Sequence, residues 1–357
     1  MVTDRAKLVR SDVTPIQSCN LYPMDFYQNL ALKQVVKMTS NGIVSECGGL
    51  HVHLDPKRGV EGGVAFVSHA HIDHLHKKKG GIVLTSRQTN EIARLRGYTM
   101  ENYSEEYENF TMIDSGHILG AKGLLFGDGI FYTGDISIRD RAFMKGAKAP
   151  RCKTLITECT FGMPEYVFPK IEDTVKRVNE IISESYSRGR PVILLGYELG
   201  KAQILSYLFS HWEPYYHDSV KKVNDVYRKF GVGLPDSLGH SEAEMKGLLD
   251  KKPWLMIAPN LSGKNAFVHH MKDKYGAITV GFSGWAQSPR FAFARQHDYS
   301  MPLSDHCDYN ELLRLVKDCN PEKIYTVHGF VEEFASDLVR MGYDAQPLIE
   351  NQLDDYF

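Results

Sequence analysis

Short apolar runs separated by polar and turn residues mark the first part of the chain, and this pattern predicts β-strands. Three of the runs are GIVSE at 42–46, LHVHLDP at 50–56 and GVAFVSHAHIDH at 63–74. Others follow at Ile82–Thr85, Phe110–Ile113, Gly123–Phe126, Ile130–Tyr132 and Thr154–Thr157, with one helical stretch up to Gly97. Several of these predicted strands lead directly into His or Asp, so we expect reactive side chains to gather at strand ends.

The apolar spacing becomes helical after Phe161. A helix is predicted from Ile171, Val175, Val178, Ile181 and Ile182, which recur at helical spacing, and Gly189 ends it. Buried strands are predicted at Pro191–Leu195, Trp254–Ala258 and Ala277–Phe282, and further helices at Gly196–Trp212 and Ala266–Lys274. Strands that alternate with helices favour parallel βαβ units. This stretch therefore predicts a separate α/β domain.

The last segment returns to the earlier pattern. Asp308 and Glu311 have the spacing of a capping box, and Asn320 with Pro321 ends the helix that they begin. A strand at Lys323–Val327 then leads into His328 and Gly329. We predict an α/β fold in which one β-rich domain, residues 1–161 and 304–357, is split by an inserted α/β domain at residues 162–303.

The length of 357 residues fits two domains, and 43% hydrophobic with 24% charged residues is ordinary for a soluble globular protein. Lys and Arg total 42 against 44 Asp and Glu, a net charge of −2. A protein that coats long nucleic acid usually has a basic surplus, so this balance argues against extended non-specific binding. It leaves room for a local basic groove, or for a site whose positive charge comes from metal.

The cysteines and the N-terminal sequence indicate a cytoplasmic protein. The six cysteines form no C-x-x-C pair and do not resemble a secreted disulfide framework; they are Cys19, Cys47, Cys152, Cys159, Cys307 and Cys319. The sequence MVTDRAKLVRSDVTP lacks an apolar leader, and no apolar run approaches the roughly 18 residues of a membrane span. We therefore expect no membrane partner.

The segment His69-Ala-His71-Ile-Asp73-His74 is the strongest chemical signal in the sequence. It places four candidate zinc ligands, three imidazoles and one carboxylate, within six residues, directly after an apolar strand. His69 and His71 share one side of an extended segment, while Asp73 and His74 lie past the turn. Four residues of so short a loop do not easily coordinate a single ion, so two ions a few ångströms apart fit this loop better.

Two more ligand candidates follow, His117 in DSGHILG at 114–120 and Asp135 in FYTGD at 131–135. With Asp55, which ends LHVHLD, all of these residues resemble the successive motifs of the metallo-β-lactamase superfamily. The resemblance implies an αββα sandwich. It implies one zinc held by His69, His71, His117 and Asp135, and a second held by Asp73, His74 and the shared Asp135. Asp55 would orient the ligand loop.

Three later segments resemble the motifs of the β-CASP nucleases within that superfamily: LITECTFG at 155–162, LSDHCDY at 303–309 and TVHG at 326–329. They flank and follow the predicted inserted domain, and the resemblance covers about residues 40–357. It implies that His328 completes the second zinc group. It also implies a nuclease, because the family consists of nucleases and some inactive relatives.

The chemistry of phosphodiester hydrolysis explains these residue types. Two zinc ions, or manganese in their place, would stabilise the growing negative charge and activate a water. His306 is the natural proton donor for the leaving oxygen, Glu158 could hold it and favour its charged form, and Asp73 could accept a proton from the water. Small-molecule hydrolases of this fold would lack the insert and His306, and a non-catalytic binding subunit would have lost ligands.

Two segments of the predicted insert are candidates for binding substrate phosphate. Gly196-Tyr-Glu-Leu-Gly-Lys201-Ala is one residue short of the P-loop spacing and lacks its Ser or Thr, which argues against a nucleotide triphosphate site. Lys201 at a helix start and Ser283, in Ser283-Gly-Trp285, could bind a phosphate of the substrate. A tight turn at Gly196–Gly200 and Trp285 as a core residue are the alternatives. Lys77–Lys79 could guide a strand into the cleft or could be simply solvated.

The resemblance within the family is strongest to ligase-associated DNA exonucleases, which share Gly-Tyr-x-Leu-Gly-Lys-Ala-Gln and Ser-Gly-Trp, and it extends to Artemis and the crosslink-repair nucleases. It implies digestion of single-stranded DNA from 5′ ends during repair, with DNA ligases and helicases as partners. His328 departs from the valine of the crosslink-repair branch and is shared with RNA-processing members such as ribonuclease J. An RNA substrate is therefore the alternative. The sequence does not define the oligomeric state.

Overall fold

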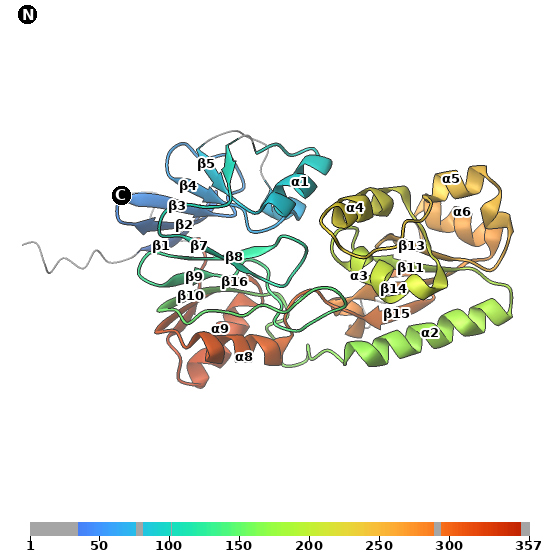
Figure 1. Ribbon diagram of the computed structural model, residues 1–357. Helices are drawn as coiled ribbons and strands as arrows, with labels where there is room; N and C mark the ends of the chain where they lie inside the picture. Colours follow the sequence, from blue (N-terminus) through green and yellow to red (C-terminus); the bar gives the residue numbers. More distant parts are fainter. Residues whose placement is uncertain (1–34, 76–80, 101, 289–293, 351–357) are drawn as a thin grey trace, which may run out of the picture. The chain divides into compact units, whose positions relative to one another are not determined.

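The computed structural model describes residues 35–75, 81–100, 102–288 and 294–350 (Figure 1). The segment Lys77–Lys79, Cys19 and the start of the predicted first domain lie outside these residues. The description below is of the described part of the unit Val35–Phe357.

Two sheets pack face to face and form the first half of the fold. The strands of the first sheet, in spatial order, are β1 Val36–Thr39, β2 Gly42–Cys47, β3 Leu50–Leu54, β4 Val64–Phe66, β5 Ile82–Leu84 and β6 Tyr103–Ser104. Those of the second sheet are β17 Ala345–Pro347, β16 Lys323–Gly329, β10 Thr154–Cys159, β9 Ile130–Tyr132, β8 Lys122–Phe126 and β7 Thr111–Asp114. The core between them joins Leu54 and Phe66 of the first sheet to Leu124, Tyr132 and other residues of the second.

Helices cover the outer faces of these two sheets, which gives the αββα layering that the resemblance implied. Helix α1, Arg87–Leu95, packs through Ile92 and Ala93 against Ala65 and Val83 of the first sheet. Helices α8, Tyr309–Cys319, and α9, Val331–Arg340, pack on the second sheet. The strands β16 and β17 and the helices α8 and α9 come from the C-terminal segment, yet β16 pairs in parallel with β10 (Figure 1). As predicted, the C-terminal segment returns to the two packed sheets, where β16 and β17 extend the second one.

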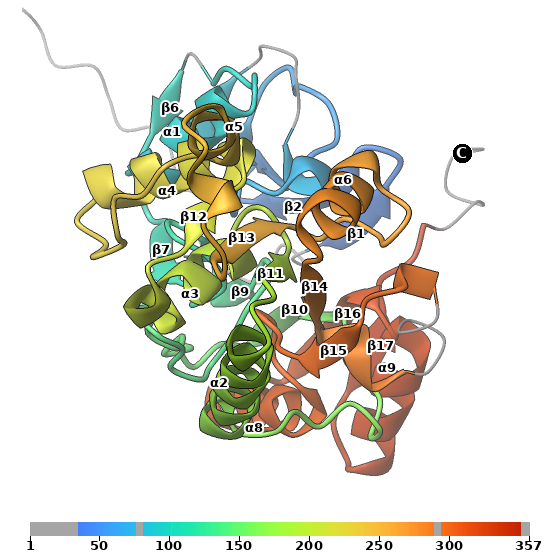
Figure 2. The same ribbon diagram turned by 90° about the vertical axis from the view of Figure 1, so that its right-hand side faces the viewer.

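The third sheet consists of parallel strands only, as the βαβ pattern predicted. Its order is β12 Tyr215–Tyr216, β13 Leu255–Pro259, β11 Val192–Gly196, β14 Ile278–Ser283 and β15 Tyr299–Pro302, so the first strand in the sequence is the central one (Figure 2). Its helices are α2 Ile171–Ser187, α3 Lys201–Leu208, α4 Asp218–Lys229, α5 His240–Met245 and α6 Ala266–Tyr275. Residues of α2 and α3 cover one face, and residues of α5 and α6 cover the other. All strands of this sheet lie between residues 192 and 302; the exact boundaries at 162 and 303 stay a prediction.

The predicted helix at Gly196–Trp212 is wrong at both ends. Helix α3 begins at Lys201, because Tyr197–Gly200 form a turn in which Gly200 has φ +95°. A side chain at Gly200 would also collide with Ile118, since an added Cβ would lie 2.4 Å from its Cγ2. After Leu208 a separate 3₁₀ turn covers Ser210–Trp212. The tight turn that the sequence left as an alternative is therefore present.

Candidate metal centre

The carboxyl ends of strands from all three sheets meet at one cleft of about 350 Å³. His71, Asp73 and His74 reach it from the loop after β4, and Asp135 from the loop after β9. The third sheet contributes Tyr197 after β11, Asn260 after β13 and Ser283 at the end of β14. Open parallel sheets place ligands at the carboxyl ends of their strands, so this arrangement fits a binding site.

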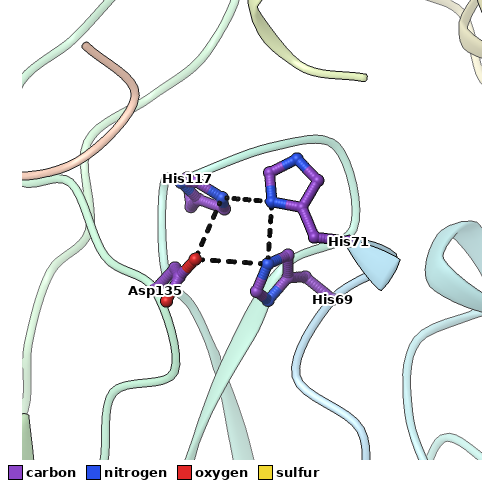
Figure 3. Close-up of side chains that lie close together, drawn as sticks. All are labelled: His69, His71, His117 and Asp135. Carbon is purple, nitrogen blue, oxygen red and sulfur yellow. Dashed lines mark hydrogen bonds and ion pairs between the residues drawn. The ribbon is translucent and has the colours of Figure 1, made fainter. Parts of the chain in front are cut away.

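Four donor atoms form a cage, and two of the residues that supply them, His71 and Asp135, also line the cleft (Figure 3). His69 Nε2 lies 3.0 Å from His71 Nδ1 and 3.3 Å from Asp135 Oδ2. His117 Nε2 lies 3.2 Å from His71 Nδ1 and 3.6 Å from Asp135 Oδ2. Ligands about 2.0–2.1 Å from a tetrahedral zinc ion lie about 3.3–3.4 Å from one another. These four separations are close to that value, and all four donor atoms lie within 4.8 Å of one another, so a single zinc ion could bind among them after small side-chain shifts.

The second nitrogen of each imidazole in the cage has its own partner outside the cage. His71 Nε2 donates to the carbonyl oxygen of Leu199 at 3.1 Å, and His117 Nδ1 donates to that of Asp305 at 2.9 Å. His69 Nδ1 lies 2.9 Å from Ser68 Oγ, which itself donates to Asp55. These partners assign the N–H to the outer nitrogen. The three inner nitrogens thus present lone pairs to one another, as metal ligands do.

Burial keeps two of these histidines neutral. Desolvation, followed by the neighbouring His69, lowers the pKa of His71 to about 3. The pKa of His117 is also well below its usual value, because burial and the nearby His306 both oppose its charge. A neutral imidazole is the form that binds metal, so these residues need lose no proton to do so.

A second group of ligand types lies on the other side of Asp135. His74 Nε2 is 3.7 Å from Asp135 Oδ1 and 3.7 Å from Asp73 Oδ2. The ring of His328 lies 5.6 Å from that of His74, centroid to centroid, and His328 lines the same cleft. The two oxygens of Asp135 therefore face the two groups separately, Oδ2 toward the cage and Oδ1 toward His74.

Asp55 fixes the loop that carries both groups. Its Oδ1 accepts from the Ser68 backbone N–H at 2.7 Å, and its Oδ2 accepts from His74 Nδ1 and Tyr132 Oη, both at 2.8 Å. Burial alone would lower the pKa of His74, but Asp135 and Asp55 outweigh it and raise that pKa to about 10. Three carboxylates, those of Asp55, Asp73 and Asp135, thus surround the single charge of His74. A bound cation would balance the remaining negative charge.

Glu158 and His306 form a pair at the edge of the cleft. Glu158 Oε1 accepts from His306 Nδ1 at 2.7 Å and from the Ile136 backbone N–H at 2.9 Å, which fixes the carboxylate. Burial opposes the charge of His306, yet Glu158 and then Asp135 raise its pKa to about 9. The side chain of His306 is 18% exposed and lines the cleft, so a protonated imidazole faces the space beside the cage.

The candidate phosphate residues also line the cleft, with partners that the sequence did not indicate. Lys201 Nζ binds Asp305 Oδ1 at 2.7 Å, and both residues are buried. Ser283 Oγ accepts from the Trp285 backbone N–H at 3.1 Å and so keeps its own O–H to donate. Trp285 packs against Phe161 and Tyr166, with ring centroids 4.7 and 5.2 Å away, in keeping with the structural alternative.

The structure adds four residues to the site that sequence reasoning missed. Tyr132 binds Asp55, and the backbone carbonyls of Leu199 and Asp305 orient His71 and His117. Arg141 is fully buried and donates to the carbonyls of Gly116 and His117. Of these four residues, only Asp305 had a signal in the sequence, because its carboxylate directly precedes the predicted site residue His306. Backbone carbonyls leave no mark in a sequence.

In the described ranges, every group of side chains with metal-ligand spacing lies in this centre: His69, His71, His117 and Asp135; His117, Asp305 and His306; and Asp135, Glu158 and His306. The same ranges contain no helix long and apolar enough to span a bilayer.

Comparison with known proteins supports this assignment. The family described as the Zn-dependent metallo-hydrolase RNA specificity domain, RMMBL, matches residues 298–346, which carry His306 and His328. The chain is 32% identical over 320 residues to a probable DNA ligase of Opitutus terrae; the match covers 85% of this chain and 30% of that protein. It is 26% identical over 338 residues to an RNase J-like protein of Methanocaldococcus jannaschii, covering 74% and 80% of the two chains.

The fold is also found in a solved structure. A protein of unknown function from Enterococcus faecalis superposes with a TM-score of 0.56 at 15% identity, over 89% of this chain and 97% of the other. The chain thus spans under a third of the ligase relative but most of the RNase J-like protein and of the solved structure. The family match and the similar relatives support membership of the β-CASP family of metal-dependent nucleases within the metallo-β-lactamase superfamily, and the solved structure shows the fold.

Proposed function

We propose that this chain is a two-zinc phosphodiesterase that digests single-stranded DNA from 5′ ends. The observation that carries the proposal is the position of Asp135, one oxygen of which faces the cage of His69, His71 and His117 while the other faces His74. A carboxylate so placed is suited to bridge two cations. Two cations about 3.5–4 Å apart are the arrangement that clamps the attacking and leaving oxygens of a phosphodiester.

The residues present fit that pair of ions. His69, His71, His117 and Asp135 would hold one zinc, and Asp73, His74, His328 and the shared Asp135 would hold the other; manganese could replace zinc. When bound, the ions would activate a water and balance the charge of the phosphate. Asp55 acts by holding His74 and the backbone of the ligand loop.

The protein's own groups would manage the protons. Asp73 is 78% exposed and lies beside His74, where it can accept a proton from the attacking water. His306, charged and held by Glu158, donates a proton to the oxygen that leaves. Ser283 and Lys201 also line the cleft, and the O–H of Ser283 is a donor for a substrate phosphate.

The choice of DNA rests on similarity. A segment similar to this chain makes up 30% of a protein named as a probable DNA ligase, and this name supports DNA as the substrate. We extend the proposal to association with DNA ligase and helicase partners in repair. The second candidate, an RNA-processing nuclease, is favoured by the RNase J-like relative and by His328. A non-catalytic binding role fits poorly, since every proposed ligand position is filled.

A side-by-side digestion tests the substrate. The wild-type chain would be incubated with zinc or manganese and with end-labelled single-stranded DNA, duplex DNA and RNA, each with a 5′ phosphate or a 5′ hydroxyl. We expect chelator-sensitive release of label from the 5′ end of single-stranded DNA, fastest with the phosphate. Faster digestion of RNA than of DNA would establish the second candidate, and no digestion of any polymer would reject both.

A further inference from the structure

The turn between β11 and α3 contacts the cage of His69, His71, His117 and Asp135 from the third sheet. The Leu199 carbonyl accepts the outer N–H of His71 at 3.1 Å. The ring of Tyr197 lies edge-on to the ring of His71, with centroids 5.0 Å apart. His71 is thus held in its orientation by residues that come from a different sheet, 128 positions along the chain.

Lys201 reaches a second histidine of the cage through Asp305. Its ammonium binds Asp305 Oδ1 at 2.7 Å, and the two residues are only 8% and 5% exposed. The carbonyl oxygen of the same Asp305 accepts the outer N–H of His117 at 2.9 Å. A buried ion pair is a rigid link, because separating its charges leaves each one uncompensated. The link therefore fixes the carbonyl that orients His117.

Gly200 lets the turn pack directly on the loop of His117. It has φ +95°, and an added Cβ would lie 2.4 Å from Cγ2 of Ile118, the residue after His117. Two neighbouring positions of the turn thus contact the cage or the loop of His117, namely Leu199 and Gly200, and the next one, Lys201, is linked to His117 through Asp305. The turn cannot shift without moving two of the four ligands.

We propose that Lys201 is a positioning residue for the first metal group, acting through Asp305 on His117, and that metal occupancy of the cage is coupled to the seating of turn 197–201. The inference rests on the proposed metal site and gives Lys201 a role other than direct contact with phosphate. Coupling between two binding events is reciprocal. The turn stabilises bound metal, and bound metal stabilises the turn against the loop of His117.

Zinc affinity measured in an Asp73→Ala background isolates the cage, because that change disables the other group. Zinc dissociation constants would be obtained by competition with a chelator. We expect Lys201→Met to weaken zinc binding by about 10–100-fold, as changes to residues that orient metal ligands do. We expect Lys201→Met with Asp305→Asn to lose no more than Lys201→Met alone, since the two changes break one link and the double change leaves no unpaired buried charge.

Two control series separate positioning from general damage. Lys145→Met and Asp140→Asn remove an exposed Lys–Asp pair and should leave zinc affinity unchanged. Gly200→Ala should weaken zinc binding, whereas Gly231→Ala should not. Gly231 has a similar φ of +84° but nothing within 4 Å of an added Cβ, so it reports backbone strain without the collision. Thermal melting confirms that each variant is folded before its affinity is compared.

The outcomes distinguish this inference from the proposed function. Two zinc ions in wild type with unchanged affinity in the Lys201→Met and Gly200→Ala variants would overturn the inference alone. A rise in KM for DNA in Lys201→Met, with zinc affinity unchanged, would show that Lys201 contacts the substrate phosphate. That result would also overturn the inference. No zinc binding by wild type would instead reject the proposed metal site. The coupling would be established by two results together. Lys201→Met would bind zinc more weakly than wild type, and its zinc-loaded peptide 197–203 would exchange amide hydrogens faster than the same peptide of zinc-loaded wild type.

Discussion

Three imidazoles whose lone pairs face one another at 3.0–3.2 Å repel unless a cation or a proton lies between them. The outer partners of His69, His71 and His117 prevent each ring from turning its N–H inward. Burial in turn disfavours a proton on His71 and His117. At the scale of single residues, the cage therefore favours a metal ion over its own protonation.

Asp73 offers the cleanest test of the second group. Its side chain is 78% exposed, so Asp73→Ala should leave the free energy of unfolding unchanged to within about 0.5 kcal/mol. Cleavage should fall about a thousand-fold, because a catalytic metal supplies several kcal/mol of charge stabilisation. The matched control is Asp128→Ala, since Asp128 is 77% exposed and pairs with surface Lys153. Normal cleavage by Asp73→Ala would show that this carboxylate is neither a ligand nor a base.

His306→Ala should slow departure of the leaving oxygen. Loss of a general acid typically costs about 10²–10⁴-fold. A nitrophenyl phosphodiester needs no such proton, so its hydrolysis should be nearly unaffected, while cleavage of DNA should fall. Rates on both substrates would be measured at saturating zinc. An equal loss on the two substrates would rule out proton donation by His306.

The pair of Glu158 and His306 predicts a pH dependence for the metal-free protein. The pKa of His306 is raised from 6.5 to about 9 by Glu158 and Asp135, against the effect of burial. Its stabilising charge is fully present below pH 6.5 and is lost as the pH rises through about 9. Urea denaturation should therefore show a larger deficit for Glu158→Gln, relative to wild type, at pH 6 than at pH 10. A deficit that grew with pH would contradict the assigned charges.

At the scale of elements, the sequence predicted what depends on local pattern. The apolar runs at Ile130–Tyr132 and Thr154–Thr157 became β9 and β10, and the continuous run at Pro191–Leu195 became the central strand β11. The amphipathic helix α4 was not predicted, although Val220, Val223 and Tyr227 follow helical spacing and are buried. The start of α3 was misplaced because Gly200 is needed for packing against Ile118, which no local pattern reveals.

The capping box at the start of α8 is the element most open to a stability test. Asp308 Oδ1 accepts from the Glu311 backbone N–H, and Oδ2 accepts from Arg139 Nη2 and the Phe168 backbone N–H at 2.9 and 3.0 Å. Asp308→Ala should cost about 3 kcal/mol of unfolding free energy, because it removes the cap and leaves a part-buried guanidinium without one partner. Asn265→Ala removes the simple cap of α6 and should cost about 1 kcal/mol. Equal losses in urea denaturation would contradict the added role of Asp308.

At the scale of the whole molecule, the site depends on contacts that local sequence cannot specify. The ligand types were predictable because H-x-H-x-D-H is dense and its residues follow a strand. The carbonyls of Leu199 and Asp305 come from segments 128 and 188 positions from their histidines. Their contacts form only in the folded chain, so no local sequence pattern predicts them. The same holds for Lys201, whose ion pair with Asp305 was not foreseen. The sequence thus indicated the candidate ligands, whose role stays a prediction, and the fold supplies the contacts that orient them.

We propose that Asp135 joins two metal groups in one cleft. The most direct measurement is the zinc content per chain after saturation and removal of free metal, for wild type and for His328→Ala, whose side chain is exposed and whose loss should spare the cage. We expect two zinc ions in wild type and one in His328→Ala, with cleavage lost in the variant. A single zinc ion in wild type, or two retained in His328→Ala, would contradict this proposal.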